Sequence, residues 1–341
     1  MAGRQPTTDL TWLGSNRPLA RAIGRPMVRF LAIEASGGIL LMVATLVALV
    51  WANSPWSGSY YDFWHTEVHL AFGDVVSLDQ DGHSLTLVGF VNDVLMAVFF
   101  FVVGLEIKRE MVTGELRRPR AAMLPVAAAL GGMVVPALIF LAFNRSGAAS
   151  TGWGIPMATD IAFAVGVVSL LGRRVPTSLK VFLLSLAIVD DIGAILVIAV
   201  FYTSDLAMDW LFLGVATTVA VATLTRLKVW YTPFYILLGS VLWYAMFRSG
   251  VHTTIAGVAM GLLAPARPLL DRAVMPPIEF DQLDAEDLRE AKFRLNESVS
   301  VASRLEHRLH PVTGFVIIPV FALANAGVDI SWGSLSNAMT S

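Results

Sequence analysis

Nine long apolar runs limit what this 341-residue chain can fold into. A helix that crosses a hydrocarbon core of roughly 30 Å needs about 20 largely apolar residues. The runs are continuously apolar and do not alternate with a period of two, which favours helices over membrane β-strands. The sequence therefore predicts an all-α polytopic membrane protein with about nine transmembrane helices. The expected spans lie near residues 28–52, 84–105, 121–143, 153–171, 179–202, 207–225, 231–247, 251–265 and 312–330.

Composition supports a membrane protein and excludes several other classes. Charged residues make up 15% of the chain, against roughly 25% in soluble domains. The formal charge of −2 gives no general attraction to nucleic acid. Because the chain has no cysteine, it forms no disulfides or thiolate metal sites. We expect membrane lipid as a partner, no nucleic acid and no cofactor.

The basic residues predict the orientation of the chain. Lysine and arginine are retained in cytoplasmic loops, and 22 of the 24 fall on one side of a nine-span topology. This distribution places segment 1–27 and the charged loop 266–311 in the cytoplasm, and loop 53–83 outside. The Asp81-Gly82 pair in that outer loop is a hairpin turn signal. We therefore expect a multi-pass protein with a cytoplasmic N-terminus, an external C-terminus and a short extracellular β-hairpin.

Five acids fall inside the predicted spans, where an unpaired charge costs a few kcal/mol or more. They are Glu34, Asp93, Asp160, Asp190 and Asp191. Glu34 lies within two turns of the cytoplasmic end, so snorkelling or a neighbouring arginine would explain it. For Asp93, a hydrogen-bonded structural role and a role in an ion pathway both stay open.

The other three acids predict an ion site near the membrane midplane. Spans 4 and 5 are antiparallel through the short connection 172–178, so Asp160 can meet Asp190 and Asp191. Adjacent residues of a helix are about 100° apart, so one of the pair can face a cavity while the other reaches a neighbouring helix. Carboxylate oxygens suit a hard cation such as Na⁺ and can hold protons instead. Competition for one site couples the two ions, although a purely structural, hydrogen-bonded role remains the alternative.

Span 4 carries a signal for a broken helix. Gly154 and Pro156 come just before Thr159 and Asp160. A helix interrupted at the midplane exposes backbone carbonyls and helix ends, which several transporters use in their ion sites. An intramembrane aspartyl protease would need its two acids on different helices, with Gly-x-Gly-Asp around one. The sequence lacks that motif, so we expect a transporter and not an enzyme.

Six segments form specific motifs: Phe99–Glu110, Met157–Ala164, Leu186–Ala194, Gly250–His252 with Ala256-Gly257, Leu305–His307 with His310-Pro311, and Phe321–Gly327. They resemble the motifs of NhaA-type sodium/proton antiporters, over roughly residues 25–335. The resemblance implies a membrane domain at 28–335 with an inverted-repeat fold, in a bacterial cytoplasmic membrane. The implied activity is secondary active extrusion of Na⁺ or Li⁺ in exchange for external protons, for sodium and pH homeostasis.

The resemblance also implies roles for individual residues. Asp190 and Asp191 would be the Na⁺ ligands, with Asp191 as the main cation and proton carrier. Asp160 and Thr159 would line the site and compensate the crossing of broken helices. Loop 53–83 would mediate a homodimer. A pH-responsive cytoplasmic surface would include Glu106, Glu110, His252 and Glu306. From the residues alone, Glu106 and Glu110 are equally typical of a solvated helix face, and His252 of an interface histidine.

The sequence departs from this family in one respect. The family has twelve spans, whereas the chain given stops after its ninth predicted span, at Ser341. The other three spans form the inverted partner of spans 3–5 and carry a lysine that pairs with the carboxylate at the position of Asp190. Two interpretations are therefore open: a sodium/proton antiporter, or a truncated, non-transporting remnant or subunit that needs a partner chain. The four lysines present, none in the middle of a span, are Lys108, Lys180, Lys228 and Lys292.

Overall fold

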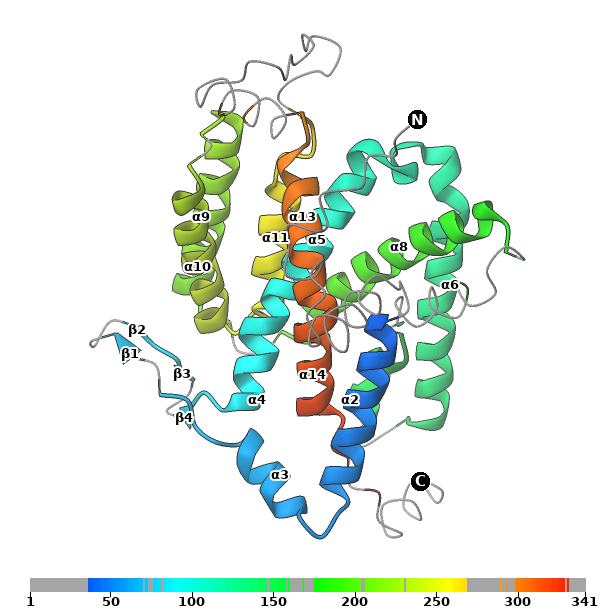
Figure 1. Cartoon of the computed structure of the whole chain (residues 1–341), viewed down its shortest axis with the longest axis vertical. Helices are drawn as coiled ribbons and strands as arrows, with labels where there is room; N and C mark the ends of the chain where they lie inside the picture. The colour runs from blue at the N-terminus through cyan, green and yellow to red at the C-terminus, as the bar shows by residue number, and fades with distance from the viewer. Residues whose placement is uncertain are drawn as a thin grey trace, which may run out of the picture.

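The computed structural model shows a largely helical protein (Figure 1). It describes residues 36–69, 71–72, 76–80, 83–145, 148–157, 159, 168, 175–203, 206–229, 231–268, 289, 293, 298–328 and 330. Among these residues, five helical segments are long and apolar enough to cross a membrane. They are Leu87–Thr113, Pro119–Phe143, Val181–Phe201, Met208–Arg226 and Val301–Asn325.

These five segments overlap five of the nine predicted spans. A sixth is counted if α2 (Ser36–Ala52) and α3 (Ser57–Trp64), which are bent by 116° at their junction, form one span. Helix α10 (Thr232–Ser249) occupies predicted span 231–247 but is less apolar, and α11 (Thr254–Leu263) is only 10 residues long. Most of predicted span 4 lies outside the described residues. A polytopic helical architecture is established, and the count of nine stays a prediction.

The first long segment contains a π turn. Helix α4 (Leu87–Phe90) runs through η3 (Val91–Leu95), which has π geometry, into α5 (Met96–Thr113). The segment at the other end of the chain has the same construction: α13 (Val301–Val312), the π turn η8 (Thr313–Ile317) and α14 (Ile318–Asn325). Helix α13 begins at Val301, well before the predicted span 312–330. Single π turns inside α-helices are often found at functional sites.

Helix α5 lies at the centre of the bundle, with α11 and α13 beside it (Figure 1). The contact with α11 is made through glycine. A Cβ atom at Gly104 would lie 2.7 Å from the carbonyl oxygen of Val258, and one at Gly261 would lie 2.5 Å from that of Phe101. A Cβ at Gly257 would overlap the carbonyl oxygen of Ala97. Small residues allow membrane helices to approach this closely.

Two further helix pairs flank this centre. Helices α9 (Met208–Arg226) and α10 pack together on one side (Figure 1). Helix α10 ends at Ser249, and the next residue, Gly250, caps it with a left-handed φ of 78°. On the other side, α6 (Pro119–Phe143) packs against α8 (Thr177–Phe201) and the 3₁₀ helix η5 (Ala148–Met157).

The corner between α2 and α3 holds the end of α14. The hydroxyl of Tyr60 donates to the carbonyl oxygen of Leu323 at 2.8 Å, and the side-chain amide of Asn53 donates to that of Val328 at 2.8 Å. The first bond satisfies a carbonyl group in the last turn of α14, where a helix end leaves such groups unpaired.

The expected hairpin segment contains two short antiparallel pairs. Strand β1 (Ala71–Phe72) pairs with β2 (Val76–Ser77), and β3 (Asp79–Gln80) pairs with β4 (His83–Ser84). They lie beside the helical bundle, beyond the start of α4 (Figure 1). The Asp81-Gly82 turn itself lies outside the described residues. A single extracellular hairpin therefore stays a prediction.

Candidate functional site

The adjacent acids Asp190 and Asp191 lie at the middle of α8, and Asp191 is the central residue of the span Val181–Phe201. Apolar residues on two faces of this helix show where each acid lies. Leu186, Val189 and Val197 pack on a cluster from α6 and η5. Ile188, Ile192 and Ile195 pack with Val103 and Ile107 of α5. Helix spacing of three or four residues places Asp190 with Leu186 on the first face and Asp191 with Ile188 and Ile195 on the second.

Asp190 is the better shielded member of the pair. It is 3% exposed, and its Oδ2 accepts a hydrogen bond of 2.5 Å from the hydroxyl of Thr159. Thr159 follows the 3₁₀ helix that contains Gly154 and Pro156, and it is itself outside any helix. Thr159 therefore lies against the acid pair, and its part in lining an ion site stays a prediction. Asp160 lies outside the described residues.

Asp191 faces the central helix. It is half-buried and lies within electrostatic range of Glu106, on α5, as well as of Asp190. Glu106 in turn lies within electrostatic range of Arg109, Glu110 and Glu306. A line of ionisable groups thus connects the middle of α8 to the end of α5. Such groups inside a span mark ion or proton pathways more often than packing sites.

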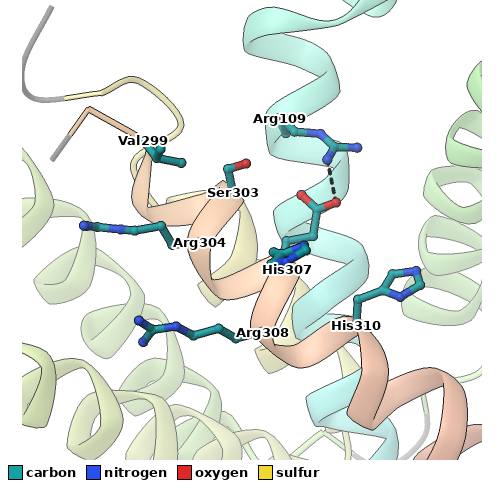
Figure 2. A pocket seen from close by; sticks show the side chains of 8 residues that line it. Arg109, Val299, Ser303, Arg304, His307, Arg308 and His310 are labelled. Atoms are coloured by element: carbon teal, nitrogen blue, oxygen red, sulfur yellow. Dashed lines mark hydrogen bonds and ion pairs between the residues drawn. The ribbon is translucent and has the colours of Figure 1, made fainter. Parts of the chain in front are cut away.

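Near its C-terminal end, α5 is joined to α13 by an ion pair. Arg109 Nη1 lies 2.6 Å from Glu306 Oε1 (Figure 2). Glu306 is 8% exposed, and its second oxygen is buried without a hydrogen-bond partner among the described residues. The sequence identified Glu306 but not its partner. Arg109 lies three residues after Glu106 at the end of an apolar run, and this position is the signal that could have identified it as a counter-charge.

Glu110 has a local contact instead. Its Oε1 accepts a hydrogen bond of 2.7 Å from the backbone N–H of Glu115, and its carboxylate covers Gly114, where a Cβ atom would overlap it. Glu110 therefore stabilises the turn that follows α5. The predicted solvated face does not describe this buried side chain, and its proposed pH role is untested.

His252 lies apart from this group, beside the C-terminal end of α8. Its Nε2 lies 3.1 Å from the carbonyl oxygen of Tyr202, whose hydroxyl accepts a bond from the N–H of Gly154 at 2.9 Å. The neighbouring Thr253 donates to Asp93 at 3.0 Å, and the indole of Trp243 donates to the carbonyl of Asp93 at 2.8 Å. Asp93 is therefore hydrogen-bonded in the first π turn, and its role in an ion pathway stays a prediction. Nothing in the sequence pattern indicated Tyr202 or Trp243.

Comparison with known proteins decides the family. The family model for Na⁺/H⁺ antiporter 1 matches residues 28–341, which is most of the chain. The chain belongs to this family. The resemblance in its motifs is thereby confirmed, and the chain is an integral membrane protein of a transporter family, not an enzyme family.

Individual members of the Na⁺/H⁺ antiporter 1 family are closely similar. The Na(+)/H(+) antiporter NhaA of Oleidesulfovibrio alaskensis is 51% identical over 324 residues, which cover 90% of this chain and 71% of that protein. The NhaA protein of Rhodopirellula baltica is 49% identical over 328 residues, covering 92% of this chain and 73% of the relative. The chain thus spans about seven tenths of the length of these relatives.

The ion pair between Arg109 and Glu306 gives a prediction about stability. Replacing Arg109 with alanine would leave a buried carboxylate without its counter-charge. We expect a loss of about 2 kcal/mol, below the usual cost for a fully buried pair because a third of the Arg109 side chain is exposed. Thermal unfolding of the detergent-purified protein measures the change.

A double-mutant cycle separates this pair from a general loss of packing. In the Glu306→Gln background, Arg109→Ala should cost much less, because no buried charge is left behind. Arg117→Ala, in the exposed turn after α5, is the matched control and should leave the melting temperature unchanged. Strictly additive effects of the two pair substitutions would contradict this assignment.

Proposed function

We propose that the chain exchanges Na⁺ or Li⁺ for protons at the Asp190–Asp191 pair, as a secondary active antiporter. The observation that carries the proposal is the division of the pair between two faces of α8. Asp190 is held by Thr159 on one face, and Asp191 lies near Glu106 on the other. The family and its named relatives support antiport as the activity.

The residues suggest how exchange would occur. A carboxylate binds either a hard cation or a proton, so the two compete for the same oxygens. Asp191, half-buried at the centre of its span, would carry the exchanged ion. Asp190, fixed by the threonine hydroxyl, would supply a second ligand oxygen in a set position. Asp160, beside Thr159 in the sequence, would complete the polar lining.

Glu106 would connect the pair to one side of the membrane. It lies between Asp191 and the Arg109–Glu306 ion pair, at the end where α5 finishes and α13 begins. We propose that this end faces the cytoplasm, because the basic residues concentrate there and lysine and arginine are retained on that side. Protons would enter the cell from outside. Na⁺ would reach the acid pair from this cytoplasmic end and then leave the cell. The membrane would be a bacterial cytoplasmic membrane, with the N-terminus of the chain inside.

The remaining expectations stay proposals. Glu106, Glu110, His252 and Glu306 would make transport respond to pH, and the exchange would need no cofactor beyond the transported ions. The strands of segment 71–84 would form part of a homodimer contact. Membrane lipid would surround the apolar faces of α6 and α9, which expose many large aliphatic side chains.

Transport in everted membrane vesicles tests the proposed function. Respiration acidifies such vesicles, and a sodium/proton antiporter releases the stored protons when Na⁺ or Li⁺ is added. We expect a fall in the pH gradient on addition of either ion and none on addition of K⁺. Vesicles from cells without the protein are the control. An identical response in the two kinds of vesicle would exclude antiport by this chain.

Thr159 offers a prediction about ion affinity. A hydrogen bond to a charged group contributes roughly 1.5–3 kcal/mol, so its removal from Asp190 should disorder a ligand oxygen. We expect Thr159→Val to raise the Na⁺ concentration for half-maximal transport about tenfold. Thr159→Ser retains the hydroxyl and should stay near the wild type. Equal half-maximal concentrations for the valine and serine variants would show that this bond does not assist ion binding.

A further inference from the structure

A second polar contact between α8 and η5 lies at the C-terminal end of α8, about three turns beyond the acid pair. Tyr202 is the residue that caps this helix, and its backbone N–H donates to the carbonyl oxygen of Ile198 at 3.1 Å. Its hydroxyl donates to the carbonyl oxygen of Thr151 at 2.8 Å and accepts from the N–H of Gly154 at 2.9 Å. One hydroxyl therefore holds two backbone groups of a single turn of η5.

The close approach of this hydroxyl depends on a glycine. A Cβ atom at Gly154 would lie 2.7 Å from the hydroxyl oxygen of Tyr202 and 3.0 Å from its ring carbon Cε2. The neighbouring ring of Trp153 meets that of Phe201 edge-on at 5.1 Å and lies 6.1 Å from that of Tyr202. These ring contacts do not use the hydroxyl, so the ring and the hydroxyl of Tyr202 can be tested separately.

Thr159 makes another contact between this segment and α8, through its hydrogen bond to Asp190. Asp190 and Tyr202 are twelve residues apart on α8, which is about 18 Å along the helix. Gly154 and Thr159 are five residues apart in the sequence, and a fully extended chain of that length reaches at most about 18 Å. The chain between the two contacts therefore has little slack, so a displacement of η5 at Tyr202 would be passed on to Thr159.

Apolar packing also holds η5, but it does not fix how far along α8 the segment lies. Met157 is 5% exposed, in a cluster with Ala129 and Met133 of α6. Apolar contacts are non-directional, whereas hydrogen bonds have preferred distances and angles. The two hydrogen bonds of the Tyr202 hydroxyl therefore supply directional contacts that set the position of η5.

We propose that Tyr202 is a positioning residue for the ion site, whose hydroxyl fixes η5 on α8 so that the hydroxyl of Thr159 reaches Asp190. The proposal rests on the proposed antiport function, because it concerns ion binding at that same acid pair. Tyr202 lies about three turns from Asp190 and acts through Thr159. Loss of its hydroxyl should weaken Na⁺ binding without removing any group that exchanges ions.

Tyr202→Phe tests the proposal, because it removes the hydroxyl and keeps the aromatic ring. We expect the Na⁺ concentration for half-maximal proton movement in everted vesicles to rise about fivefold, the effect of losing a neutral hydrogen bond. The maximal rate should stay within about twofold of the wild type, because both acids and Thr159 remain. Tyr235→Phe is the matched control. It removes a hydroxyl bond of 2.7 Å to the carbonyl oxygen of Val229, in α10, and should leave the half-maximal concentration unchanged.

Hydrogen exchange of the detergent-purified full chain reports the same contact without transport. The backbone N–H of Gly154 loses its acceptor in Tyr202→Phe, so it should exchange about fivefold faster than in the wild type. Mass spectrometry of the peptide that contains η5 measures the rate. Equal exchange in the variant and the wild type would overturn the proposal, because the hydroxyl would then not hold this segment.

A double-mutant cycle separates positioning through Thr159 from a general loosening of the bundle. In the Thr159→Val background the positioned hydroxyl is already absent, so Tyr202→Phe should raise the half-maximal Na⁺ concentration by less than about twofold. With a wild type that transports, an unchanged value in Tyr202→Phe alone would overturn this proposal and leave the proposed function intact. A full effect of Tyr202→Phe in the valine background would do the same. A wild type that moves no protons on addition of Na⁺ would contradict the proposed function, and this proposal with it.

Discussion

Asp191→Asn should abolish Na⁺-dependent and Li⁺-dependent proton movement, reducing it to the level of vesicles that lack the protein. The amide has nearly the same shape as the carboxylate, so packing against α5 should survive. It carries no charge for the cation and no exchangeable acid proton, so neither half of the exchange can take place. The fall of the pH gradient in everted vesicles, followed on addition of Na⁺ and then Li⁺, measures the exchange that remains.

Asp209→Asn is the matched control for this experiment. Asp209 is an exposed acid in the first turn of α9, away from the acid pair. The substitution makes the same change of charge and should leave the vesicle response at the wild-type level. Both variants should be present in the membrane in equal amounts. Full activity of Asp191→Asn under these conditions would exclude Asp191 as the ion carrier.

Gly257→Ala should cause the second large loss, this time of the folded bundle. The added methyl group would overlap the carbonyl oxygen of Ala97 and lie 2.9 Å from the backbone nitrogen of Phe101. Both are backbone atoms of α5, so no side-chain rotation relieves the clash. Overpacking usually costs 1–3 kcal/mol, and we expect about 3 kcal/mol because the obstacle is backbone. Thermal unfolding in detergent measures the change.

Gly131→Ala tests whether glycine replacement alone has this effect. Gly131 is exposed within α6, and nothing lies within 4 Å of an added Cβ atom. Alanine is favoured over glycine by about 1 kcal/mol inside a helix, so this variant should be as stable as the wild type or more so. The Gly257 substitution should also reduce transport, because α5 carries Glu106 toward Asp191. Equal melting temperatures for the two variants would refute a glycine-dependent contact between α5 and α11.

Much of the architecture is predictable from sequence because the bilayer imposes a simple rule. Runs of about 20 apolar residues become helices, since no other structure satisfies the backbone in lipid. The rule finds α6 and α8 nearly to their ends. It does not find where α13 begins, because the first turns of that helix carry Arg304, Glu306 and Arg308 and are polar. It also cannot detect the π turns, which depend on contacts such as that between Trp243 and Asp93.

The acid pair is predictable for a similar reason. Two adjacent carboxylates in the middle of an apolar run are costly and therefore conspicuous. Which face each acid occupies follows from the helix period once the neighbouring helices are known, but the sequence does not say which helix covers which face. The link from Asp191 to Glu106 needed the packing of α8 on α5. The pairing of Arg109 with Glu306, 197 residues apart, likewise required the tertiary structure.

Proton release from the purified full chain on addition of Na⁺ is the most direct test of competition between the two ions. In weakly buffered detergent solution, binding of Na⁺ to protonated carboxylates must displace protons into the medium, where a pH indicator reports them. We expect release that saturates with Na⁺ or Li⁺, is absent with K⁺, and is lost in Asp191→Asn. Saturable release that persists unchanged in Asp191→Asn, or no release from the wild type at any Na⁺ concentration, would contradict it.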